Sequence, residues 1–90
     1  ELTIDDGAKK ALVNGKSLLA AGIKKVSGKF SKGDHIKIID IKNNEFARGL
    51  SSFSSDEITK IIGCHSNEIK KILGYISKSE VVHKDDMVTI

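Results

Sequence analysis

The 90-residue sequence predicts a mainly β domain with short helices (α+β), built as a small closed or half-closed barrel. Two observations favour this fold: about five short segments have strand-like residues between turn signals, and glycine is frequent whereas proline is absent. With 39% hydrophobic and 30% charged residues, the composition is that of a globular chain rather than a disordered one. This length suits one hydrophobic core, so we expect a single domain over residues 1–90.

The chain opens with a strand and a helix. Residues 2–4 predict a short edge strand, and Asp5 or Asp6 is the expected cap of the helix that follows. Apolar residues at i, i+3 and i+4 spacing identify this helix: Ala8, Ala11 and Leu12. Asn14-Gly15 is a typical helix end, so the predicted helix is short.

The next apolar segment predicts a strand over residues 17–26. Gly22 lies inside it and is expected to be a bulge or a point of close backbone approach. Residues 28–33, which begin and end with glycine, predict a turn. Asp34 follows that turn and is interpreted as its anchor rather than as a catalytic residue.

A hairpin is predicted next, with strands at residues 35–41 and 45–53. Asn43-Asn44 tolerates positive φ and therefore suits the turn between them. The first strand has isoleucines on both faces, at positions 36 and 38 on one and at 39 and 41 on the other. This strand is therefore either buried on both faces or bulged.

Two similar segments, Ser55–Gly63 and Ser66–Gly74, follow at an offset of eleven residues. Each has a serine cap, an acid in its first turn and a glycine stop, which predicts a pair of short helices. Helices of about two turns are unstable alone, so they must dock on the sheet. The apolar residues expected at that contact are Ile58, Ile61, Ile62, Ile69, Ile72 and Leu73. Residues 80–90 predict the last strands around a turn at residues 83–86.

Positive charge is concentrated in the first third of the chain, although the net charge is only +3. Residues 1–33 hold seven lysines against three acids, whereas residues 34–90 hold eight basic and nine acidic residues. A clustered basic face attracts nucleic-acid phosphates, but a solvated lysine surface fits the same pattern equally well. Because Arg48 is the only arginine, any bound RNA would be held by backbone and shape more than by sequence.

The sequence contains no catalytic constellation. Gly15-Lys16-Ser17 resembles the end of a phosphate-binding loop, but Lys10 stands where that motif needs a glycine. His35, His65 and His83 are scattered and lack the spacing of zinc ligands. We therefore expect no catalytic residue, no cofactor-binding residue and no metal ligand in these 90 residues.

Cys64 and the aromatic residues have ordinary structural interpretations. Cys64 is either a reactive thiol near a helix start or a small residue in a turn, and the turn is favoured. As a single cysteine it fits a reducing, cytosolic compartment. The four aromatic residues are expected in the core rather than on an RNA-stacking platform: Phe30, Phe46, Phe53 and Tyr75.

Several short motifs follow one another in a recognisable order: Asp5-Asp6-Gly7-Ala8, Leu18-Leu19, Gly22-Ile23, Gly28-Lys29-Phe30, Gly33-Asp34 and Ala47-Arg48-Gly49. This order resembles the PUA domain, named for pseudouridine synthases and archaeosine transglycosylase. A second, more specific set completes the chain: Arg48-Gly49-Leu50, Ser54-Ser55-Asp56-Glu57, Ser66-x-Glu68-Ile69, Leu73-Gly74-Tyr75 and Glu80-Val81-Val82-His83-Lys84-Asp85-Asp86. With these motifs, the whole chain is similar to the C-terminal PUA domain of the bacterial glutamate 5-kinase family.

The resemblance implies a PUA-like β pseudobarrel that is a non-catalytic accessory domain of a longer cytoplasmic enzyme. Kinases of that family transfer the γ-phosphate of ATP to the side-chain carboxylate of glutamate, the first step of proline synthesis. Their catalytic amino-acid kinase domain lies upstream, so ATP and magnesium are expected there and no cofactor is expected here. The chain starts at Glu1 directly in a strand pattern, which also suggests a piece of a longer polypeptide.

PUA domains of RNA-modifying enzymes hold RNA with the first helix and the strand after it. The resemblance therefore implies a candidate RNA-binding set in this sequence: Lys9, Lys10, Lys16, Gly22, Lys24 and Lys25. The partners that we expect are structured RNA, the upstream kinase domain and further copies of the parent chain, with no membrane. The alternative is an RNA-binding PUA domain of an RNA-modifying or translation-associated protein. Regulation, domain packing and assembly are the other roles that the resemblance leaves open.

Overall fold

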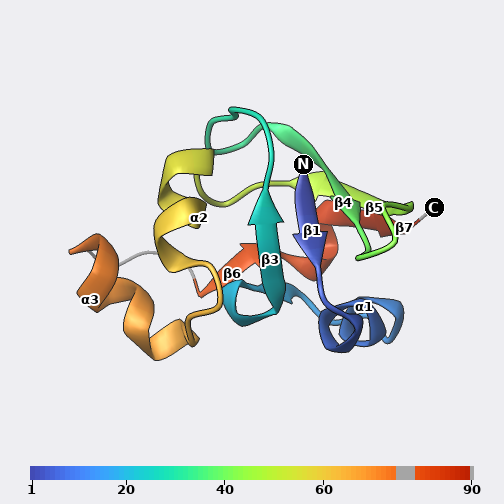
Figure 1. The fold of residues 1–90 in the computed structure, drawn as a ribbon, viewed down its shortest axis with the longest axis horizontal. Coiled ribbons are helices and arrows are strands. Elements are labelled where there is room, and N and C mark those ends of the chain that lie inside the picture. Colours follow the sequence, from blue (N-terminus) through green and yellow to red (C-terminus); the bar gives the residue numbers. More distant parts are fainter. Residues whose placement is uncertain (75–78, 90) are drawn as a thin grey trace.

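The computed structural model describes residues 1–74 and 79–89, which form two β-sheets around one core with short helices outside them (Figure 1). The strands are β1 (Leu2–Ile4), β2 (Leu18–Leu19), β3 (Ile23–Val26), β4 (His35–Ile39), β5 (Glu45–Leu50), β6 (Glu80–Val82) and β7 (Met87–Thr89). The α-helices are α1 (Asp6–Val13), α2 (Ser55–Ile61) and α3 (Ile69–Leu73), and the 3-10 helices are η1 (Ala20–Gly22), η2 (Ser66–Glu68) and η3 (Lys84–Asp86). The predicted core position of Tyr75, the predicted cap by the Ser66 side chain and the predicted strand end at Ile90 lie outside the described residues.

The larger sheet has five strands in the order β3-β1-β4-β5-β7. The prediction of an edge strand at residues 2–4 is wrong, because β1 pairs with β3 on one side and with β4 on the other. The pair β1–β4 is parallel and the other neighbours are antiparallel, so the sheet is mixed. The second sheet consists of β2 and β6, which pair antiparallel although they are far apart in the sequence. These sheets and helices give the predicted α+β class and the predicted PUA-like pseudobarrel.

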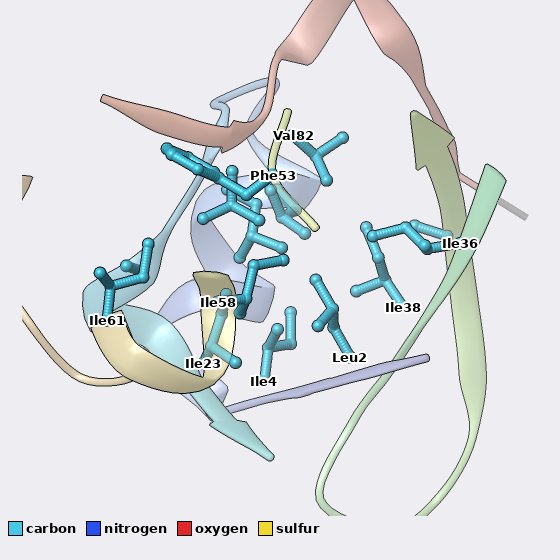
Figure 2. Packing of buried hydrophobic residues seen from close by; sticks show 14 of the residues in the cluster. Leu2, Ile4, Ile23, Ile36, Ile38, Phe53, Ile58, Ile61 and Val82 are labelled. Carbon is cyan, nitrogen blue, oxygen red and sulfur yellow. The ribbon is translucent and has the colours of Figure 1, made fainter. Parts of the chain in front are cut away.

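The core lies between the two sheets and α2 (Figure 2). Phe53 is fully buried, and Figure 2 shows its side chain beside those of the strands and of α2. The prediction that both helices dock on the sheet is confirmed for α2, which contacts β3 and buries Ile58 and Ile61. α3 packs mainly on α2 and η2 instead, which leaves Ile69 buried but Ile72 40% exposed. Ile62 and Leu73 are partly buried against the core.

The continuous strand predicted over residues 17–26 is wrong. Leu18 pairs with Val82 in the smaller sheet, whereas Ile23 pairs with Ile4 in the larger one. The chain must therefore turn from one sheet to the other, and η1 makes that turn. The backbone N–H of Gly63 donates to the carbonyl of Ala20 and holds the turn against the segment after α2, with an N···O distance of 2.9 Å.

The predicted hairpin forms with shorter strands. The register between β4 and β5 shifts at Ile38 and Ile39, so β4 is bulged there. Of the two interpretations of the isoleucine pattern, the bulge is therefore confirmed. Ile41 lies beyond the end of β4 and is 57% exposed. The predicted positive φ is found at Asn43, with φ of 67°. The second strand ends at Leu50 rather than at residue 53. After Leu50 the chain leaves the sheet, and the side chain of Phe53 is buried in the core.

The cap of α2 is Ser54 and not the predicted Ser55. The Ser54 hydroxyl accepts a hydrogen bond from the backbone N–H of Glu57, and the Glu57 carboxylate accepts one from the backbone N–H of Ser54. Ser55 is buried instead, and its hydroxyl accepts from the backbone N–H of Phe30 at 3.1 Å. A capping box in this position fixes where α2 begins.

Candidate nucleic-acid interface

Helix α1 is held in place by Asp5, which precedes it. The Asp5 carboxylate accepts a hydrogen bond from the backbone N–H of Ala8 at 2.7 Å, so Asp5, rather than Asp6, is the helix cap. The backbone N–H of Asp5 donates to the carbonyl of Gly22 at 3.0 Å. One residue thus starts the helix and ties it to η1.

Gly22 makes the close approach that the sequence predicts. A Cβ atom at this position would lie 2.5 Å from the Cβ of Ala8, which is shorter than any ordinary carbon–carbon contact. Glycine is therefore required here because α1 and η1 are in direct contact, and not because of an unusual φ. The small side chain of Ala8 is the other half of this contact.

A shallow groove of about 270 Å³ runs beside this contact, between α1 and the segment that follows it. Small and apolar residues dominate its lining: Asp5, Ala8, Ala11, Ser17, Leu18, Leu19, Ala21 and Gly22. Leu19 is 43% exposed although it is a large apolar residue. The groove offers backbone and apolar surface, and the one charged residue in its lining is Asp5, whose carboxylate already caps α1.

The predicted lysines lie on three segments: α1, the loop after it, and β3, which follows η1. Lys10 is exposed on α1, on the face that it shares with Asp6 and Asn14 rather than on the face beside η1, and Lys16 is exposed in the loop after α1. Lys24 and Lys25 are exposed on β3, which is an edge strand of the larger sheet (Figure 1). Within residues 1–74 and 79–89, none of these four ammonium groups forms an ion pair with an acidic side chain. They are therefore available to an incoming polyanion.

Lys9 differs from the other four lysines because its ammonium is already paired. Its Nζ lies 2.8 Å from Oδ2 of Asp40 and 5.4 Å from the centre of the Phe46 ring. Both partners belong to the β4–β5 hairpin, whereas Ala8 and Ala11 face the groove beside η1. Lys9 thus connects α1 to the hairpin, and an anion would have to compete with Asp40 for it.

Asp40 is the residue that sequence reasoning missed. Its side chain is only 5% exposed, and its Oδ1 accepts hydrogen bonds from the backbone N–H groups of Lys42 and Asn44, both at 2.9 Å. The hydrogen bond from Lys9, together with these backbone N–H groups, lowers the pKa of Asp40 to about 2. An aspartate two residues before a Lys-Asn-Asn turn is a known signal for this kind of side-chain-to-backbone bond.

We expect Asp40→Asn to weaken the acid sensitivity of the fold. Because the folded-state pKa of Asp40 lies below the ordinary value of 3.8, its stabilising effect is present above about pH 4 and is lost as the pH falls toward 2. In Asp40→Asn, the free energy of unfolding should fall less steeply over that window than in the unchanged chain. Urea unfolding at a series of pH values measures this slope.

The exposed Asp56 provides the matched control for that measurement. We expect Asp56→Asn, which removes a carboxylate from the surface of α2, to keep the steep pH dependence between about pH 2 and 4. Equal slopes in Asp40→Asn and in the unchanged chain would contradict the role assigned to the Lys9–Asp40 pair.

The aromatic residues that the structure describes do not form a stacking platform. Phe53 is buried, and Phe30 and Phe46 are half-buried against the core, as the sequence predicts for them. Cys64 is half-buried between α2 and η2. Within residues 1–74 and 79–89, no three His, Cys, Asp or Glu side chains gather as they would to bind a metal ion.

None of the helices in the same part of the chain is long and apolar enough to cross a membrane.

The sequence was compared with models of known protein families. The model of the PUA domain matches residues 1–73. The chain belongs to the PUA domain family. Among curated proteins it is 76% identical to the glutamate 5-kinase of Pelagibacter ubique over 89 residues, which are 99% of this chain and 24% of that protein. It is 49% identical to the glutamate 5-kinase of Agrobacterium fabrum over 98% of this chain and 23% of that protein.

These relatives confirm the resemblance to the PUA domain of glutamate 5-kinases. This PUA domain spans about a quarter of the length of the curated relatives that it matches. Solved structures agree on the fold. A PUA domain from Aeropyrum pernix, in a tartrate complex, superimposes with a TM-score of 0.66 at 19% identity, over 91% of this chain and 40% of that one. A PUA domain protein from Thermoplasma acidophilum gives 0.62 at 23% identity, over 91% of this chain and 46% of that one.

Proposed function

We propose that this PUA domain is a non-catalytic accessory domain of a cytoplasmic glutamate 5-kinase, at the C-terminal end of that enzyme. The observation that carries the proposal is the 76% identity to one such enzyme, which extends over 99% of this chain but only 24% of the relative. The parent enzyme transfers the γ-phosphate of ATP to the side-chain carboxylate of glutamate, and the ATP and magnesium sites lie in its kinase domain.

Two measurements test this part of the proposal. The 90-residue chain, incubated with glutamate, ATP and magnesium, should produce no glutamyl phosphate, and turnover by the chain alone would contradict its non-catalytic role. The reading frame upstream of the codon for Glu1 should encode an amino-acid kinase domain. If that reading frame encoded an RNA-modifying or translation-associated domain instead, the parent would not be a glutamate 5-kinase. The chain would then be the RNA-binding PUA domain of such a protein.

We propose further that the PUA domain binds structured RNA at the surface around η1. Four exposed lysines support this: Lys10, Lys16, Lys24 and Lys25. Lysine ammonium groups attract phosphates as point charges, so the interface reads backbone and shape more than sequence. The groove beside Gly22 lets a nucleic-acid backbone approach α1 closely, because small residues line it.

The salt dependence of RNA binding tests the second part. If four lysines each neutralise one phosphate, the logarithm of the association constant should fall with the logarithm of salt concentration with a slope of about −3 to −4. Fluorescence anisotropy with a labelled RNA hairpin, from about 20 to 200 mM salt, covers the range over which counterion release is strong. Failure to bind at the lowest salt concentration would contradict RNA binding without affecting the assignment to glutamate 5-kinase.

A further inference from the structure

A second depression, of about 480 Å³, lies between α1, the β5 and β7 strands and η3. Eight residues line it: Lys9, Leu12, Val13, Gly15, Phe46, Lys84, Met87 and Thr89. This face of α1 differs from the face of Ala8 and Ala11, which lines the groove beside η1. The volume lies within the roughly 300–1,000 Å³ of ordinary small-molecule sites.

The lining combines an apolar surface with two cations and contains no acidic side chain. Leu12, Phe46 and Met87 provide the apolar part and come from three different elements, α1, β5 and β7. Each of them also packs in or against the hydrophobic core, so their positions are set by the fold. Lys84 provides the positive charge, because the charge of the other lysine, Lys9, is paired with Asp40.

Lys84 is the cation that is free to meet a ligand. Its backbone N–H donates to the Ser17 hydroxyl at 2.9 Å, which fixes this position of η3 beside the loop after α1. Its side chain is exposed, and its ammonium makes no ion pair with any residue in the described part of the chain. The Lys9 ammonium lies over the Phe46 ring and its charge is compensated by Asp40, so Lys84 carries the uncompensated positive charge of the depression.

We propose that this depression binds a small organic anion with an apolar body. The carboxylate or phosphate group of the ligand lies against Lys84, and its body packs on Leu12, Phe46 and Met87. A cationic ligand is disfavoured, because its amino group would meet the unpaired Lys84 ammonium and no carboxylate in the lining. The site is separate from the lysines Lys10, Lys16, Lys24 and Lys25, so it does not depend on RNA binding.

Ligands of similar size and different charge test the proposal. Benzoate, phenyl phosphate, benzyl alcohol and benzylamine share one ring and carry a carboxylate, a phosphate, no charge and a positive charge. In ¹H–¹⁵N correlation spectra of the 90-residue chain, we expect saturable shifts around Leu12, Lys84 and Thr89 with benzoate, phenyl phosphate or both. Whichever of these two anions binds more tightly shows whether the site prefers a carboxylate or a phosphate. Equal binding of benzyl alcohol or benzylamine, or no saturable shift with either anion, would overturn the proposal.

Three variants locate the site. Lys84→Ala should weaken anion binding about two- to fivefold, which is the size of one exposed charge contact. Val13→Glu introduces a carboxylate at a lining position that is 68% exposed, so it should abolish binding without loss of the fold by circular dichroism. Lys32→Ala removes an exposed lysine of the β3–β4 turn and should leave binding unchanged. Equal affinities of Lys84→Ala and Lys32→Ala would place the anion elsewhere and contradict the assignment.

Discussion

We expect Phe53→Ala to lower the free energy of unfolding by about 3–5 kcal/mol, the usual cost of removing a large aromatic side chain from a core. Phe53 is the largest fully buried side chain of the described residues, and it lies between the smaller sheet and α2 (Figure 2). A domain of this size has roughly 5–15 kcal/mol of stability in total, so the variant should be marginally folded at 25 °C. Urea unfolding followed by circular dichroism measures the difference.

Val88→Ala is the matched control for that measurement. Val88 lies on the edge strand β7 and is 70% exposed, so its truncation should change the free energy of unfolding by no more than about 0.5 kcal/mol. If Phe53→Ala lowered the free energy of unfolding as little as Val88→Ala does, Phe53 would not be a core residue. That result would contradict the packing of Phe53 between the smaller sheet and α2.

The second large effect is expected for Gly22→Ala, because the new Cβ would lie 2.5 Å from the Cβ of Ala8. Neither atom is at the end of a flexible side chain, so α1 has to move away from η1. We expect a loss of about 1–3 kcal/mol, as for other overpacked sites. The same displacement should change the amide chemical shifts along α1 and weaken RNA binding, because Lys10 and Lys16 would move relative to Lys24.

Gly7→Ala is the control within the same helix. A Cβ at position 7 would lie 3.5 Å from the Asp5 carboxylate, an ordinary contact. Alanine should therefore stabilise α1 slightly, by up to about 1 kcal/mol, because glycine is a poor helix former. Gly22→Ala with the same stability as the unchanged chain would contradict the tight α1–η1 contact.

Local sequence patterns predicted most of the elements of this fold. The start of α1 after Asp5 and its end at Asn14-Gly15 follow from cap chemistry, and the structure has both. The β4–β5 hairpin follows from its apolar strands and from Asn43, the one described non-glycine residue with positive φ. Such features depend on residues that are near one another in the chain, which is why periodicity and turn residues predict them.

Features that depend on distant contacts were predicted less well. The division of residues 17–26 into β2, η1 and β3 arises because β2 pairs with β6 and β3 pairs with β1. Nothing in the local apolar pattern marks that change of partner. The exposure of Ile72 has the same origin, because it depends on where α3 docks and not on the helix pattern itself.

The candidate interface was predicted in part. A close approach at Gly22 was one of two predicted alternatives, but its partner, α1, was not predicted. The exposed positions of Lys10, Lys16, Lys24 and Lys25 are as expected for a basic face. The pairing of Lys9 with Asp40 was not predicted, because the two residues are 31 positions apart. The assignment of these residues to RNA binding stays a prediction.

RNA affinity in two quadruple variants tests the central claim most directly. The first changes Lys10, Lys16, Lys24 and Lys25 to alanine. The second, a control of equal charge, changes four exposed lysines on other segments: Lys32, Lys42, Lys60 and Lys71.

Because both variants lose four charges, any difference between them reports position rather than net charge. At about 50 mM salt, we expect the first variant to lose at least tenfold in affinity for a structured RNA hairpin, with a salt slope close to zero. The control should keep most of the affinity and the slope. Equal losses in the two variants, or unchanged binding by the first, would contradict an RNA interface around η1.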